Sequence, residues 1–105
     1  MTSITRGSGN VFADIGLPDP ETHLVKAELV RWIGKLIEAE GLTQGDAAER
    51  IGMSQPDVSK MLKGQFRPIS MERLMRCIVA LGHSVTIDVA PPKKKSAPEV
   101  KVAAR

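Results

Sequence analysis

The feature that most constrains the fold of this 105-residue chain is Gly52, which stands between two short segments with helical spacing of apolar residues. Each segment starts at a hydroxyl residue, Thr43 or Ser54, whose side chain can accept a hydrogen bond from the first turn of a helix. Gly52 allows the left-handed backbone of a sharp turn, and the small Ala48 lets two helices approach closely. The sequence therefore predicts helices over residues 44–51 and 55–63, joined by a tight turn.

The apolar residues on either side of this glycine predict one shared core. Counted from Gln44, the small residue, the glycine and the apolar residues all fall where a helix-turn-helix needs them. An ordinary pair of packed helices is the alternative, because a glycine after a short helix is common, but the joint match favours the helix-turn-helix. The predicted core of this unit consists of Ala47, Ala48, Ile51, Gly52, Met53, Val58, Met61 and Leu62.

Two further helices are expected on either side of the unit. Asp19 and Pro20 are a favourable helix start, and apolar residues then follow helical spacing to Glu40, where Gly41 ends the pattern. Ser70 is a third hydroxyl cap, and the helix that it begins is expected to extend over 71–81 and to stop at Gly82. The chain is thus expected to be mainly helical.

The ends of the chain differ from this helical part. Residues 84–89 alternate polar and β-branched apolar side chains, which predicts a strand that needs a partner from a second subunit or another protein. Residues 1–18 are interpreted as a flexible arm, and residues 91–105, with Lys93, Lys94 and Lys95, as a disordered basic tail. Residues 19–90 then form one helix-turn-helix domain.

Composition narrows the function classes. The single cysteine excludes an internal disulfide, and the chain has neither an apolar stretch of membrane-spanning length nor a secretory signal pattern, so a cytoplasmic protein is expected. Only 3% of the residues are aromatic, which disfavours a stacking surface for single-stranded nucleic acid and leaves duplex DNA as the better target. The net charge of +3 is compatible with this partner but does not require it.

No residue set supports an enzyme, a metal site, a cofactor or a small-molecule ligand. His23 and His83 lie far apart in the sequence without a second cysteine near them, which argues against zinc. Cys77 has apolar neighbours and is interpreted as a buried filler rather than a nucleophile. The carboxylates are scattered and the glycines occur singly, so neither an acid/base pair nor a phosphate-binding loop is expected.

The segment from Gly41-Leu42-Thr43-Gln44 to Leu81-Gly82 resembles the Cro/C1-type repressors, also called the XRE family. The resemblance implies an all-α, lambda-repressor-like domain of four or five helices, to which we add one C-terminal strand. It also implies a transcriptional repressor that binds inverted-repeat operators as a homodimer, with the second helix of the motif in the major groove.

Carried onto this sequence, the resemblance implies two groups of DNA contacts. The residues expected to contact bases are Gln55, Ser59 and Lys60. Those expected to contact phosphates are Gln44, Ser54, Lys63 and Arg67. Two residues depart from the family pattern: Pro56 removes one base-reading side chain, and Asp57 brings a negative charge near the groove, where we assign it to capping.

Residues 9–18 and 23–30 resemble single-domain antitoxins of HigA type. That resemblance implies a type II toxin-antitoxin module, in which the protein neutralises a RelE/HigB-like toxin and represses its own operon. The docking strip for the toxin would be Val11, Phe12, Ile15 and Leu17. Two alternatives stay open: a stand-alone XRE-type repressor, and a protein-interaction adaptor that keeps the fold but has lost DNA binding.

Overall fold

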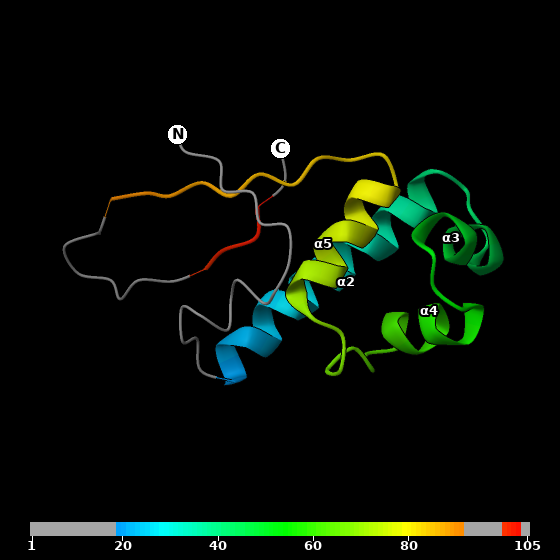
Figure 1. Cartoon of the computed structure of the whole chain (residues 1–105), viewed down its shortest axis with the longest axis horizontal. Coiled ribbons are helices and arrows are strands. Elements are labelled where there is room, and N and C mark those ends of the chain that lie inside the picture. Colours follow the sequence, from blue (N-terminus) through cyan, green and yellow to red (C-terminus); the bar gives the residue numbers. More distant parts are fainter. Residues whose placement is uncertain (1–18, 92–99, 104–105) are drawn as a thin grey trace.

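The computed structural model describes residues 19–91 and 100–103, and in this part the chain forms four helices. They are α2 (Asp19–Ala39), α3 (Gln44–Ile51), α4 (Gln55–Leu62) and α5 (Met71–Ala80). Figure 1 shows α2 and α5 side by side, with α3 and α4 together at one end of the pair. The expected all-α architecture is therefore confirmed. The helix bounds agree with the predicted ones to within one residue at either end.

Hydroxyl caps fix the starts of the three shorter helices. The Thr43 Oγ1 accepts a hydrogen bond from the Asp46 N–H at 3.0 Å, and the Asp46 carboxylate accepts one from the Thr43 N–H at 3.5 Å. Ser54 and Ser70 accept the corresponding bonds from the N–H groups of Asp57 and Arg73. Replacing such a cap by alanine typically costs about 1 kcal/mol, so these residues set where each helix begins.

One apolar core joins all four helices. The largest side chains that are almost completely enclosed are Ile33 of α2, Val58 and Met61 of α4, Leu74 and Cys77 of α5, and Leu81 directly after it, and Ala47 of α3 is also fully enclosed. Enclosing one aliphatic side chain of this size stabilises the fold by about 1.5–3 kcal/mol. Because α4 contributes two of these side chains, one face of that helix is committed to the core.

The loop between α4 and α5 is attached to α2 at two points. The rings of His23 and Phe66 stack with their centroids 5.0 Å apart, and the Lys26 Nζ donates to the Arg67 carbonyl oxygen at 2.9 Å. The buried Phe66 carries most of this attachment through its apolar area. The segment that follows α4 is therefore held against the longest helix.

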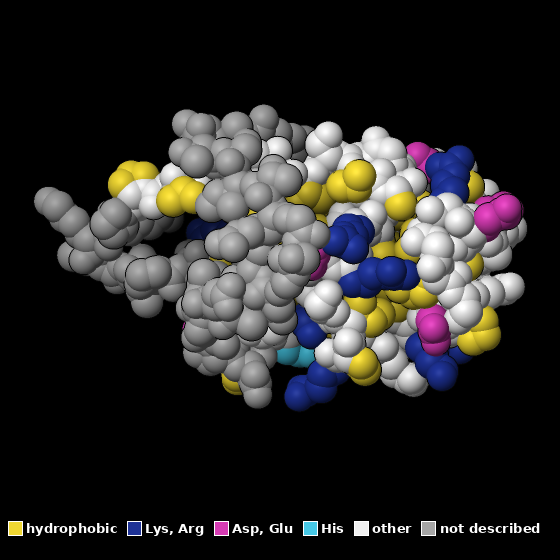
Figure 2. Space-filling model, viewed as in Figure 1, with side chains coloured by type: hydrophobic (Ala, Val, Ile, Leu, Met, Phe, Trp, Pro, Cys, Tyr) yellow, Lys and Arg dark blue, Asp and Glu magenta, His cyan; other side chains and the backbone are white. Residues whose placement is uncertain are grey.

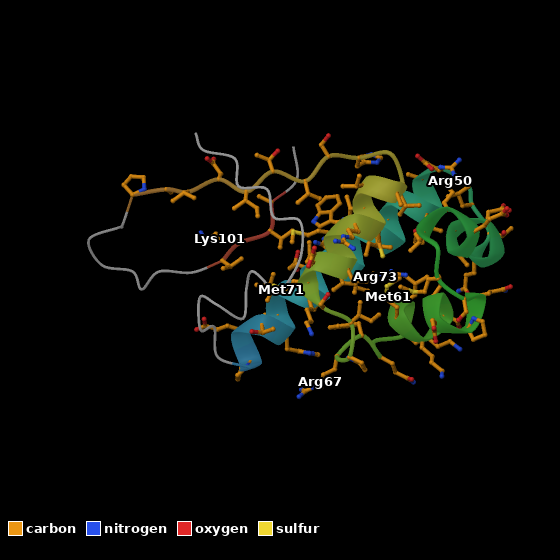
Figure 3. The ribbon with its side chains drawn as sticks, viewed as in Figure 1. Arg50, Met61, Arg67, Met71, Arg73 and Lys101 are labelled. Atoms are coloured by element: carbon orange, nitrogen blue, oxygen red, sulfur yellow. The ribbon has the colours of Figure 1, made fainter. Side chains whose placement is uncertain are left out.

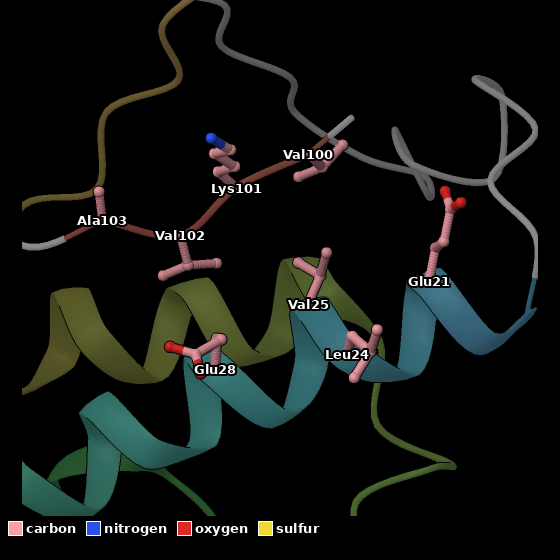
Figure 4. A pocket seen from close by; sticks show the side chains of 8 residues that line it. All are labelled: Glu21, Leu24, Val25, Glu28, Val100, Lys101, Val102 and Ala103. Atoms are coloured by element: carbon pink, nitrogen blue, oxygen red, sulfur yellow. The ribbon is translucent and has the colours of Figure 1, made fainter. Parts of the chain in front are cut away.

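The C-terminal segment differs from the sequence expectation. Residues 83–91 carry no regular secondary structure, so the strand expected over 84–89 is not formed in the single chain. The physical reason is that a strand exists only through hydrogen bonds to a neighbour. Val85 nevertheless packs against the core, and Figure 4 shows Val100 and Val102 beside α2, near Val25.

An open groove of about 500 Å³ lies between residues 100–103 and the first half of α2. Its apolar floor includes Leu24 and Val25, and Glu21, Glu28 and Lys101 also line it (Figure 4).

None of the described helices is both long and apolar enough to cross a membrane.

Candidate nucleic-acid interface

The turn between α3 and α4 has the geometry that the sequence predicts. Gly52 adopts φ +76° and ψ +35°, and its N–H donates to the Ala48 carbonyl oxygen at 2.9 Å. The Met53 N–H donates to the same oxygen at 3.1 Å, so the last turn of α3 is closed before the chain reverses. This closed turn fixes the direction in which α4 leaves α3.

The predicted core of the motif divides into an enclosed and a half-buried set. Ala47, Ala48, Val58 and Met61 are buried between the helices. Ile51, Met53 and Leu62 are half-buried and pack against the core from its rim, while Gly52 is exposed. The seam between α3 and α4 is thus apolar throughout, but the end of the motif remains open to solvent.

The three residues expected to contact bases lie on α4. Gln55, the first residue of the helix, and Lys60 are exposed, whereas Ser59 is half-buried. On the same helix, Val58 and Met61 have 0% of their surface exposed, and Lys60 lies on the side away from them. The polar side chains that α4 offers to solvent are therefore the long Lys60, the long Gln55 at the helix start and the short, partly covered Ser59.

The start of α4 lies close to the start of α3. A Cβ built on Gly45 would lie 3.6 Å from the Gln55 Oε1, which places the Gln55 amide over the first turn of α3. Pro56 occupies the first turn of α4, where a missing N–H costs nothing. The Gln55 amide therefore lies beside the first turn of α3, whose leading N–H groups have no carbonyl partner within the helix.

The four residues expected to contact phosphates, Gln44, Ser54, Lys63 and Arg67, are all exposed. Ser54 accepts the cap bond from the Asp57 N–H at 3.2 Å, but its hydroxyl hydrogen can still be donated elsewhere. The Arg67 backbone is held by Lys26, and its side chain projects from the lower edge of the molecule in Figure 3. Ser54 precedes α4, Lys63 and Arg67 follow it, and Gln44 begins α3.

Positive charge on this side of the molecule is not neutralised by ion pairs. The ion pairs among the described residues are Arg31–Glu28, Arg50–Glu40 and Arg76–Glu72, so Lys60, Lys63 and Arg67 are not engaged in one. Figure 2 shows Lys and Arg side chains in the middle and along the lower edge of the helical part. Charges without an internal partner are free to meet phosphate groups.

The comparisons with known proteins agree with this geometry. A family model described as a helix-turn-helix domain matches residues 11–90. A solved structure described as an XRE family transcriptional regulator is 32% identical and superposes with a TM-score of 0.79, covering 84% of this chain and 100% of its own. No curated protein sequence matches the chain. The chain belongs to the XRE family of helix-turn-helix regulators. The expected family resemblance is thereby confirmed.

In this XRE regulator, one contact near the motif has no sequence signal. The Arg73 guanidinium of α5 donates a hydrogen bond to the Gly52 carbonyl oxygen at 3.0 Å. The two residues are 21 positions apart, so neither helical spacing nor a cap pattern relates them. Figure 3 shows Arg73 between α5 and the α3–α4 pair. The helix that packs behind the motif thus holds its turn directly.

The one cysteine of this XRE regulator lies buried in α5. Burial raises the pKa of the Cys77 thiol above its ordinary value of 9.0, against a smaller opposite effect of the nearby Arg73 charge, so the thiol is kept neutral. Within the described ranges, no group of three or more metal-binding side chains comes together. The expected toxin-docking strip at residues 11–17 lies outside the described residues.

Proposed function

We propose that this XRE regulator is a cytoplasmic, sequence-specific repressor that binds DNA as a homodimer and places α4 in the major groove. The observation that carries the proposal is the division of α4 into two faces. Val58 and Met61 are enclosed in the core, while Lys60 is exposed on the side away from them and Gln55 is exposed at the start of the helix. A helix whose inner face is fixed in this way presents its outer side chains in a constant orientation.

The exposed side chains suit the chemistry of base edges in the major groove. The Gln55 amide can donate to N7 and accept from the N6 amino group of adenine, because it carries both a donor and an acceptor. Lys60 is a donor only and suits the O6 and N7 acceptors of guanine. Ser59 is short and half-buried, which restricts it to a base that approaches closely.

The phosphate contacts would fix the position of the helix on the duplex. Ser54 and Gln44 stand at the starts of α4 and α3, where N–H groups and the helix dipole favour an anion. Lys63 and Arg67 follow α4. Two copies related by a twofold axis would enter successive major grooves about 34 Å apart, so the operator should be an inverted repeat.

The experiment that tests this proposal replaces Gln55 and Lys60 by alanine and measures affinity for the promoter fragment of the protein's own gene by fluorescence anisotropy. Each lost base contact should weaken binding to this fragment by about 1–3 kcal/mol and relax the preference for one base pair. Binding to unrelated DNA should change much less, since base contacts carry the sequence information.

Two matched variants serve as controls. Lys35→Ala removes the same charge from an exposed site on α2 and should leave operator affinity nearly unchanged. Arg67→Ala removes a phosphate contact and should weaken binding to all sequences alike. If the unmodified protein ignores its promoter at low salt, the proposal is wrong and the interaction adaptor that has lost DNA binding takes its place.

An antitoxin of a RelE/HigB-like toxin is a second candidate function. It rests on the resemblance of residues 9–18 and 23–30 to HigA-type antitoxins, and the apolar island of Val11, Phe12, Ile15 and Leu17 falls within the region that the helix-turn-helix family model matches. Co-expression with the adjacent open reading frame tests it. A basic partner of about a hundred residues that co-purifies supports the antitoxin, and a product that purifies alone leaves the stand-alone repressor.

A further inference from the structure

The segment that follows α5 has the pattern of a strand but not the bonding of one. Val85 and Ile87 are half-buried, while Ser84, Thr86 and Asp88, which alternate with them, are exposed, so the period of two persists in the structure. Of the described residues, those from 84 to 91 make no backbone hydrogen bond. Val89 has 61% of its surface exposed. A row of unpaired N–H and C=O groups of this kind is a template for another strand.

We propose that residues 84–90 pair with the same residues of a second copy as an antiparallel two-stranded ribbon, and that this ribbon joins the DNA-binding dimer. The inference rests on the proposed function, because an inverted-repeat operator requires two copies related by a twofold axis. An antiparallel pair of identical strands has this same symmetry, since each residue on one strand exchanges roles with its equivalent on the other.

The sequence of the segment selects one register. Directly opposite residues share a face, so a ribbon with an apolar face must pair odd-numbered residues with odd-numbered ones. Centring the ribbon on Ile87 places Val85 opposite Val89 of the second copy. It also places Asp88 opposite Thr86. Two other arrangements would bring the two Asp88 carboxylates together and are disfavoured. They are an antiparallel ribbon centred on Asp88 and a parallel pair of strands in register.

The same register explains the exposure of Val89. Val85 already packs against the core, so its partner in the ribbon would be carried to the edge of that core. With Ile87 at the centre, this partner is the exposed Val89 of the second copy. Val79 of α5, with 57% of its surface exposed, lies just before the segment and offers further apolar area. A two-stranded ribbon needs such packing to be stable in water.

Spin labels on the polar face of the segment test both the pairing and its register. Single cysteines replace Ser84, Thr86, Asp88 or Ala90, all exposed, in a Cys77→Ala background. Because each chain carries one label, any spin–spin coupling is between copies. At about 3.3 Å per residue, the two labels of a dimer labelled at position 86 should be offset along the ribbon by about 7 Å, and the same holds for position 88. The two labels of a dimer labelled at position 84, or at position 90, should be offset by about 20 Å.

The expected result is therefore a symmetric pattern about position 87, with strong line broadening at 86 and 88 and longer pulsed-EPR distances at 84 and 90. Dilution with unlabelled protein should remove the coupling. Thr86→Pro and Ile87→Pro each delete a backbone donor, and because hydrogen-bonded and non-hydrogen-bonded pairs alternate along an antiparallel ribbon, one of the two should raise the dimer dissociation constant at least about tenfold. Thr86→Ala and Ile87→Val, which keep the N–H, should not. Circular dichroism at low protein concentration verifies that the variants keep their helices.

The pairing is overturned by a dimer without coupling between labels, by distances that are shortest away from position 87, or by unchanged dimer affinity in both proline variants. A monomer whose segment pairs only with its own residues 100–103 also shows no coupling and overturns it. Anisotropy with the promoter fragment keeps the two proposals apart. Operator binding by a dimer without label coupling refutes the ribbon alone, and label coupling without operator binding refutes the repressor alone.

Discussion

At the scale of single residues, Gly45 and Gly52 place opposite demands on the backbone. Gly52 sits at φ +76°, a left-handed conformation that residues with a side chain adopt only with strain. Gly45 lies within α3, and a Cβ there would make only ordinary contacts with Gln55 and Thr43. One glycine is required by the turn, whereas the other weakens a helix.

Substitution by alanine should therefore act in opposite directions at these two sites. Gly45→Ala should stabilise the fold by up to about 1 kcal/mol through helix propensity. Gly52→Ala should destabilise it by about 1–2 kcal/mol, although nothing lies within 4 Å of the added methyl group, because the cost is in the backbone. Urea unfolding of both variants measures the two free energies, and a Gly52→Ala variant of unchanged stability would contradict the argument.

Many residue-scale features could be predicted because they depend on neighbours in sequence. The caps at Thr43, Ser54 and Ser70 and the left-handed Gly52 follow from local hydrogen bonding and sterics. The burial of Cys77 was expected from its apolar neighbours and is confirmed. The sequence could not predict that Ile51 and Met53 are only half-buried at the rim of the core. Their exposure depends on how far α2 and α5 extend over the motif.

At the scale of helices, the Arg73 bond to Gly52 connects α5 to the turn of the motif. Arg73→Met should lower the free energy of unfolding by about 1 kcal/mol, because a partly solvated charged donor to a carbonyl contributes modestly. Hydrogen exchange should be faster at the Met53 amide, whose own bond closes the same turn.

Arg76→Met is the matched control for this prediction. Arg76 lies one turn further along α5 in an exposed ion pair with Glu72, and an exposed i,i+4 pair contributes only about 0.3–0.5 kcal/mol. Its replacement should leave exchange at Met53 unchanged. Equal effects of the two variants on Met53 would show that charge, rather than the bond to Gly52, is responsible.

The elements themselves illustrate where sequence reasoning reaches its limit. The four helices could be predicted because each carries its own start signal and apolar period, and their order specifies the family fold. The strand over 84–89 was expected from an equally clear pattern, yet its formation needs a partner that one chain does not supply. The attachment of Phe66 to His23 is likewise a contact between distant segments and has no local signal.

At the scale of the whole molecule, the single core predicts that all helices unfold together. Ile33 is completely enclosed and belongs to the cluster that also contains side chains from α3, α4 and α5. Ile33→Val should lower the free energy of unfolding by about 0.5–1.5 kcal/mol. Trp32, the one tryptophan, is next to it and reports on α2 by fluorescence.

Unfolding curves from Trp32 fluorescence and from helical circular dichroism should therefore coincide in the unmodified protein, and both should shift equally in Ile33→Val. Separate midpoints would show that α3 and α4 unfold apart from α2, which would contradict a single cooperative core.

The outward face of α4 is small, since Pro56 offers no polar group to it and Ser59 is partly covered. A surface of this size can specify only a few base pairs, and so short a DNA sequence recurs by chance many times in a genome. In the proposed dimer, most of the discrimination between genes would then come from the distance and angle at which the two copies are held. A change far from the DNA, where the copies meet, could redirect the regulator to other promoters while every base contact stays the same.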